Sequence, residues 1–229
     1  MEGRIVRTFD GDILTLRLRA LELGGLAIDQ VQRAVQALLR DDEAAAGEVI
    51  ERTAQLTASA RTLDEEIVGL IARRQPVAYD LRAILTIGRV GGDLERAGGA
   101  ARKIARRALE LHESTNALPP RFYHDVRKMS RLALAMLRDA LDCFDRVDLE
   151  GAEAVQQRDR DLDAEFQLAL RELVTYVMED PRCLANTVQT IFVIKALERV
   201  GDHARNIASL VQRLVHREEH APPAQAAGV

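Results

Sequence analysis

The stretch Ala196–Ala208, with the sequence ALERVGDHARNIA, predicts an α-helix from the spacing of its apolar residues. These residues recur every three or four positions, as they do along one buried stripe of a helix. The stripe comprises Leu197, Val200, Ala204, Ile207 and, just beyond the stretch, Val211. Glu198 and Asp202 stand four residues apart, so both carboxylates lie on one face of this helix. Like charges at this spacing oppose helix formation by roughly 0.2–0.5 kcal/mol. The pair indicates either a solvated face, with Arg199 as the counter-charge, or a bound cation.

A second stretch, Asp93–Ala105 with the sequence DLERAGGAARKIA, repeats the first one 103 residues earlier in the chain. An internal repeat of this kind predicts a duplicated structural unit. Another acidic pair at helical spacing, Asp159 and Asp163, precedes the second copy of the repeat. Carboxylates from two neighbouring helices of one unit are typical of a metal site.

The prolines divide the rest of the chain into segments that are free of helix breakers. The sequence therefore predicts an all-α fold, with two antiparallel three-helix bundles that arise from an internal duplication. We expect the first bundle over residues 1–115, the second over 116–218, and a flexible tail over 219–229. The expected helices cover residues 9–40, 43–73, 79–112, 121–146, 149–178 and 181–217.

The composition excludes several classes of protein. The 229 residues carry a net charge of −4, so a general nucleic-acid binder with a basic surface is not expected. No run of about 18 apolar residues is present, and the first residues lack an apolar signal region, so we expect a cytoplasmic protein. The two cysteines, Cys143 and Cys183, are expected to be buried free thiols.

Four carboxylates in the second half are the candidate metal ligands: Asp159, Asp163, Glu198 and Asp202. Adjacent helices in a bundle lie about 8–10 Å apart, so side chains from both can converge on an ion between them. Oxygen ligands suit hard cations such as Mg²⁺, Mn²⁺ or iron, and zinc less well. His203 lies about 100° around the helix from Asp202 and is expected to be exposed or to stand behind the ligands.

The run Leu197–His203 (LERVGDH) and the upstream run Arg73–Arg82 (RRQPVAYDLR) resemble motifs of the PhoU family, regulators of bacterial phosphate uptake. The similarity extends from Phe9 to Arg217, which is nearly the whole chain. The resemblance implies a metal-binding adaptor that negatively controls phosphate uptake and the phosphate-starvation response. It implies contacts with the ATPase subunit of a phosphate ABC transporter and with a sensor histidine kinase, and contact with the membrane only through these partners. It leaves open whether the protein is a homodimer.

The first repeat departs from the acidic pattern of this family. Glu95 is present, but Gly99 stands at the position of the second acid, and the preceding helix carries Thr53 and Thr57. One carboxylate and two hydroxyls supply little of the charge that hard-cation sites draw from acidic ligands. We therefore expect metal in the C-terminal bundle only, with Glu95 as the remnant of a degraded site on a more apolar first bundle.

Two other functions are considered. A carboxylate-bridged dimetal enzyme, an oxidase or a phosphatase, would use Glu-x-x-His motifs in its bundle, and the sequence contains none. The sequence also shows no Ser/His/Asp or Cys/His combination of the kind used for nucleophilic catalysis, so no catalytic residue is predicted. A purely structural helical scaffold would leave the acidic pairs unexplained.

Overall fold

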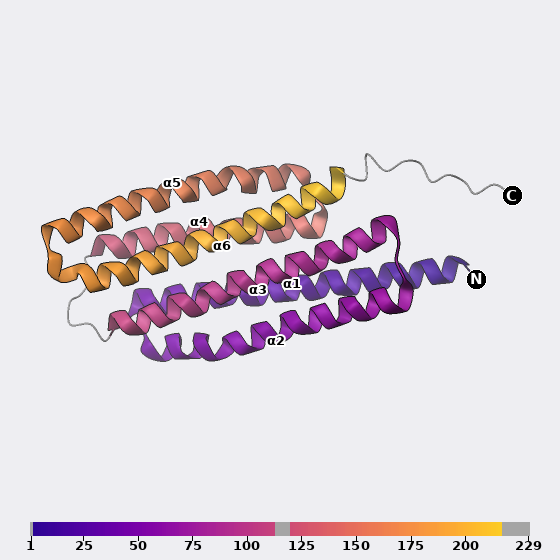
Figure 1. Ribbon diagram of the computed structural model, residues 1–229, viewed down its shortest axis with the longest axis horizontal. Helices are drawn as coiled ribbons and strands as arrows, with labels where there is room; N and C mark the ends of the chain where they lie inside the picture. Colours follow the sequence, from indigo (N-terminus) through magenta and orange to yellow (C-terminus); the bar gives the residue numbers. More distant parts are fainter. Residues whose placement is uncertain (1, 113–119, 217–229) are drawn as a thin grey trace.

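The computed structural model describes residues 2–112 and 120–216, and every regular element in these residues is helical. The six long helices lie along one another (Figure 1). Their bounds are α1 (Glu2–Arg40), α2 (Glu43–Arg74), α3 (Ala78–His112), α4 (Pro120–Arg146), α5 (Leu149–Glu179) and α6 (Leu184–His216). The predicted all-α class is confirmed.

The sixth helix begins later than expected. A short 3₁₀ turn, η1 (Pro181–Cys183), stands where the sequence predicts the start of the helix, and α6 follows at Leu184. The side chain of Asp180 caps this turn by accepting a hydrogen bond from the backbone N–H of Arg182 at 3.2 Å. Pro181 occupies the first position of the turn, which suits its fixed φ and its missing N–H.

Each repeat forms a three-helix bundle, and the two bundles pack against each other. Helix α3 contacts α6 and helix α1 contacts α4, while α2 and α5 lie on the outer flanks (Figure 1). The buried apolar residues of both bundles form one continuous core. The predicted boundary at 115/116 and the predicted tail at 219–229 fall outside the described residues.

The turns that open the second helix of each bundle match in detail. Asp41 and Val147 both adopt the left-handed conformation, with φ of 56° and 55°. Asp42 and Asp148 follow as N-caps, and each side chain accepts a hydrogen bond from the backbone N–H three residues later, at 2.9 and 3.1 Å. The same local chemistry therefore begins α2 and α5.

A glycine in each repeat lets two helices approach closely. A Cβ atom placed on Gly98 of α3 would collide with the side chain of Leu56 on α2. In the same way, a Cβ atom on Gly201 of α6 would collide with Leu162 on α5. These pairs are equivalent in the two repeats, and they put the outward faces of α2 and α3, and of α5 and α6, in matching positions.

Both cysteines are buried, as the sequence predicts, and burial raises the pKa of the Cys143 thiol to about 11. No helix among residues 2–112 and 120–216 is long and apolar enough to cross a bilayer.

Candidate functional site

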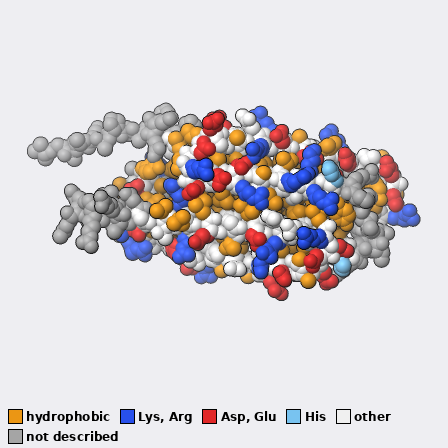
Figure 2. All heavy atoms as spheres, turned by 180° about the vertical axis from the view of Figure 1, so that it is seen from behind, with side chains coloured by type: hydrophobic (Ala, Val, Ile, Leu, Met, Phe, Trp, Pro, Cys, Tyr) orange, Lys and Arg blue, Asp and Glu red, His pale blue; other side chains and the backbone are white. Residues whose placement is uncertain are grey.

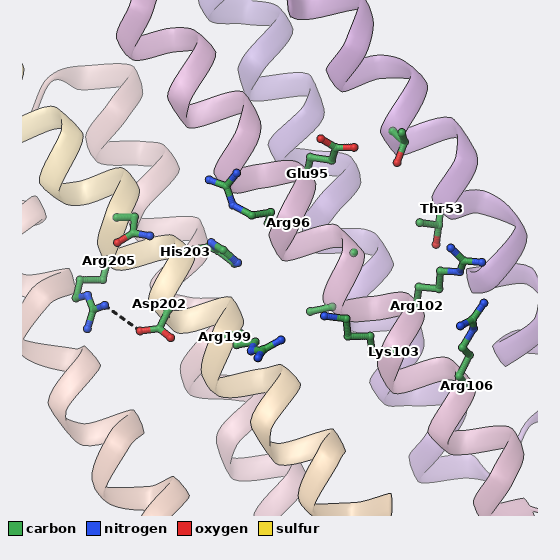
Figure 3. Close-up of a pocket in the computed structure, with 14 residues that line it drawn as sticks. Thr53, Glu95, Arg96, Arg102, Lys103, Arg106, Arg199, Asp202, His203 and Arg205 are labelled. Atoms are coloured by element: carbon green, nitrogen blue, oxygen red, sulfur yellow. Dashed lines mark ion pairs between the residues drawn. The ribbon is translucent and has the colours of Figure 1, made fainter.

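Two of the predicted metal ligands share one arginine. Asp159 on α5 is buried, with 5% of its surface exposed, and its Oδ2 accepts a hydrogen bond of 2.6 Å from Nη1 of Arg205. The other terminal nitrogen of the same guanidinium lies 2.9 Å from Oδ1 of Asp202, as Figure 3 shows. Arg205 therefore joins a carboxylate of α5 to a carboxylate of α6.

The other two predicted ligands have different surroundings. Oε1 of Glu198 accepts a hydrogen bond of 2.6 Å from Lys195, whose ammonium lies 5.1 Å from the centre of the Phe166 ring. Oε2 of Glu198 is buried without a hydrogen-bond partner among the described residues. Asp163 is exposed at the surface of α5.

Within residues 2–112 and 120–216, no three His, Cys, Asp or Glu side chains come together as metal ligands could. Arg205 forms ion pairs with both Asp159 and Asp202, and Lys195 forms an ion pair with Glu198. Two cationic side chains of the chain itself therefore pair with three of the four predicted ligands, and Asp163 is not among them. In this arrangement Asp159, Asp202 and Glu198 would each have to exchange a cationic side chain for a metal ion in order to bind it.

The electrostatics of Asp159 reflect its burial. Loss of water raises the pKa of its carboxyl group, and the nearby negative charges of Asp163 and Asp202 raise it further. The hydrogen bond and the positive charge of Arg205 oppose this rise without cancelling it. Arg205 therefore lowers the free energy that is needed to keep the buried carboxylate of Asp159 ionised.

A second buried carboxylate, Asp93 on α3, connects the two repeats. Its Oδ1 accepts hydrogen bonds from Nδ1 of His203 at 2.9 Å, from Arg96 at 2.8 Å and from Asn206 at 3.4 Å. Burial opposes ionisation of Asp93, but the hydrogen bonds from His203 and Arg96 outweigh it and lower the pKa of the carboxyl group. His203 is mostly buried, so it packs across the interface between α3 and α6 instead of standing exposed or behind a metal ligand.

The cavity that lies across α2, α3 and α6 has a volume of about 870 Å³. Thr53, Thr57, Glu95 and Gly99, the four positions at which the sequence predicts the remnant of a first site, all line it. Six cationic side chains line it too, against the two acids Glu95 and Asp202 (Figure 3). The cations are Arg96, Arg102, Lys103, Arg106, Arg199 and Arg205.

The prediction of a more apolar face on the first bundle is therefore wrong, because this face is strongly basic. Sequence reasoning missed Arg102, Lys103 and Arg106 as site residues. The signal was available, since Arg102 and Arg106 stand four residues apart on one face of the helix, and Lys103 directly follows Arg102.

The face on which α1 and α4 lie has a different character. Figure 2 shows that positively and negatively charged side chains there border a band of hydrophobic ones. Since the whole chain carries a net charge of −4, the excess of positive charge around the cavity is a local feature.

The family profile described as the PhoU domain matches residues 20–108 and 126–211, one match in each repeat. A protein from Pseudomonas putida named phosphate-specific transport system accessory protein PhoU homolog is 46% identical over 92% of this chain and 82% of its own length. The phosphate-specific transport system accessory protein PhoU of Escherichia coli is 32% identical over 89% of this chain and 83% of its own length.

Solved structures agree with these sequence matches. The crystal structure of PhoU from Pseudomonas aeruginosa superposes with a TM-score of 0.87 at 44% identity, over 91% of this chain and 99% of that one. The phosphate transport system regulatory protein PhoU from Streptococcus pneumoniae gives a TM-score of 0.83 at 27% identity, over 90% and 96% of the two chains.

Proposed function

We propose that this chain, which belongs to the PhoU family, is a cytosolic adaptor that restrains phosphate uptake and phosphate-starvation signalling. In this proposal it acts by binding other proteins and carries out no reaction of its own. Its partners are the ATPase subunit of a phosphate ABC transporter and a sensor histidine kinase, and through them it reaches the membrane.

The match of both repeats to one family is the observation that carries this proposal. The relatives named above are accessory or regulatory proteins of phosphate transport. The architecture is compatible with such a role, because long helices offer extended faces to a partner protein. The buried residues form a continuous core, which would hold these faces in a fixed arrangement.

A deletion in the host organism tests the regulatory role. With phosphate in excess, loss of the gene should raise the activity of a phosphate-starvation promoter, and a plasmid copy of the wild-type gene should restore repression. Unchanged promoter activity after deletion would contradict the proposal.

A pull-down from the same host tests the partners. The tagged chain should retain the transporter ATPase and the sensor kinase, whereas a tagged unrelated helical bundle should not. If the promoter responds but neither partner is retained, the regulatory role stands and these two contacts are wrong.

A metal ion at the second repeat (Mg²⁺, Mn²⁺ or iron) remains a separate proposal with its own test. Binding there would require Arg205 to release Asp159 and Asp202, so no part of the proposed regulation is assigned to a metal. Metal analysis of the purified protein should show a loss in Glu198→Ala with Asp202→Ala but not in Glu95→Ala. Phosphatase or oxidase activity that disappears in Asp202→Ala would favour the dimetal enzyme instead.

A further inference from the structure

We propose that the basic cavity across α2, α3 and α6 binds a small anion that carries two or more phosphoryl groups. The inference concerns a ligand of the isolated protein, so it does not depend on which partner proteins the chain contacts. It rests on unpaired cations, on the way in which the two repeats differ, and on the shape and chemistry of the cavity.

Four of the cationic side chains that line the cavity lack a counter-charge. Arg102, Lys103, Arg106 and Arg199 are exposed, and none forms an ion pair with any residue in the described ranges 2–112 and 120–216. Unpaired cations that line one hollow repel one another, and a bound anion relieves this repulsion.

The first of these cations is unpaired because the repeats diverged. Arg102 in α3 corresponds to Arg205 in α6, where the guanidinium pairs with two carboxylates. In the first repeat, Thr53 and Gly99 stand at the positions of those carboxylates. The arginine has been kept while both of its anionic partners are absent, and Arg102 extends toward Thr53 in Figure 3.

A second cation is unpaired for the converse reason. Arg199 in α6 corresponds to Arg96 in α3, and Arg96 pairs with Asp93 at 2.8 Å. The second repeat has Ala196 at the position of Asp93, so Arg199 has no such carboxylate on its own helix. Its side chain lines the cavity instead.

The arrangement of the cations favours a ligand with more than one anionic group. Arg102 and Arg106 extend from α3 on the side of α2, whereas Lys103 and Arg199 extend toward each other between α3 and α6 (Figure 3). A single phosphate ion could occupy only one of these positions. The cavity volume of about 870 Å³ lies at the upper end of the range for small-ligand sites.

The lining also identifies the chemical class. Arginine presents planar pairs of N–H donors that match the oxygens of a phosphoryl group, and three of the four unpaired cations are arginines. Among the described residues, the lining contains no Phe, Tyr or Trp side chain on which a nucleobase could stack, and its one imidazole, His203, is held by Asp93. The site is therefore suited to recognise phosphoryl groups and not a nucleobase, and inorganic tripolyphosphate is the simplest ligand of this class.

Calorimetric titration of the full chain with tripolyphosphate, pyrophosphate and orthophosphate tests the inference. Tripolyphosphate should bind at least about tenfold more tightly than orthophosphate, with an affinity that falls as salt is added. Arg102→Gln with Lys103→Gln should weaken tripolyphosphate binding by about tenfold or more. Gly99→Asp should act in the same direction, because a Cβ atom there meets open space and the new carboxylate would stand beside Arg102.

A matched control removes the same charge from another face. Arg127→Gln with Arg131→Gln on α4 alters two exposed arginines away from the cavity and should change the affinity less than about twofold. Circular dichroism checks that every variant is folded.

Three results would overturn the inference. The first is that tripolyphosphate does not bind, and the second is that the control weakens binding as much as the cavity variants do. The third is that an oligoglutamate peptide of equal charge binds as tightly with the same dependence on Arg102 and Lys103, which would assign the cavity to an acidic protein segment. All of these outcomes are measured without partner proteins, so they leave the proposed regulation untouched.

Discussion

In the first repeat Leu56 packs over Gly98, and in the second repeat Leu162 packs over Gly201, so both bundles are assembled in the same way. On the outward face just beside these contacts the two repeats differ. The second repeat surrounds Arg205 with carboxylates, whereas the first leaves its equivalent arginine unpaired at a cavity. Close packing fixes the residues of the interior, whereas a different residue at the position of a carboxylate on this face, such as Thr53 or Gly99 in the first repeat, leaves the packing of the core unchanged. The duplicated core has therefore stayed symmetrical, and its surface has been free to acquire two different chemistries.

The largest expected effect tests the symmetry of the core. Leu56→Ala and Leu162→Ala should each lower the free energy of unfolding by about 3–5 kcal/mol, because both side chains are almost completely buried. Urea denaturation of the two variants measures this loss. A loss in one repeat that is several times the loss in the other would show that the cores are not equivalent.

The glycine partner sharpens this test. Gly201→Ala added to Leu162→Ala should recover about 1 kcal/mol, since alanine favours the helix and fills part of the space that the leucine leaves. In the wild-type background the same methyl group collides with Leu162, so the recovery should be absent there.

The next effect concerns Asp93, which has no counterpart in the second repeat. Asp93→Ala should cost about 2–3 kcal/mol, because His203 and Arg96 lose the buried acceptor that they share. The folded protein holds the pKa of Asp93 below its ordinary value of about 3.9. The stabilisation is therefore complete above that pH and disappears as the pH falls through the lowered pKa. Denaturation of wild type and variant between pH 7 and pH 3 should show the difference shrink only at the acidic end.

A smaller effect separates the two equivalent arginines. Arg205→Ala should lower stability by about 1–2 kcal/mol because it leaves buried Asp159 without its partner, whereas Arg102→Ala should change stability by less than about 0.5 kcal/mol. Burial and the neighbouring acids raise the pKa of Asp159, so protonation favours the folded state and the deficit of Arg205→Ala should be smaller at pH 4 than at pH 7. Thermal unfolding of the two variants compares them directly. Equal losses would contradict the difference between the two faces.

The smallest effect should again be the same in both repeats. Asp42→Ala and Asp148→Ala each remove a helix N-cap and should each cost about 1 kcal/mol. Asp42→Asn and Asp148→Asn keep a side-chain acceptor at each cap, and they provide the matched controls. Chemical denaturation of the four variants would expose an unequal role of the two turns.

The helices could be predicted from the sequence because their boundaries depend on local chemistry. Proline breaks and aspartate caps act within a few residues, and the spacing of apolar residues reports burial directly. The start of α6 was predicted too early, since Pro181 can begin either a 3₁₀ turn or an α-helix. The resemblance of two short motifs led to the family, which the matches to both repeats confirm.

The candidate site was less predictable because it depends on which side chains meet across helices. The spacing of Glu198 and Asp202 places them on one face but does not reveal that Lys195 pairs with one and Arg205 with the other. The contact between His203 and Asp93 joins residues 110 positions apart, and no local pattern reports it. The two repeats do carry one readable signal. Arg102 corresponds to Arg205, but the two carboxylates that pair with Arg205 are replaced by Thr53 and Gly99 in the first repeat.

The carboxylate of Asp93 belongs to one bundle, while two of its hydrogen-bond donors, His203 and Asn206, belong to the other. One bundle therefore cannot open without leaving a buried charge in its neighbour short of partners. This free-energy cost arises when the interface between α3 and α6 separates. It therefore couples the unfolding of α3 to that of α6, and the duplicated chain should unfold as one cooperative unit. Amide hydrogens in the middle of both helices should then exchange with the solvent at a common, slow rate set by global unfolding, even though each bundle has a complete set of turns and caps of its own.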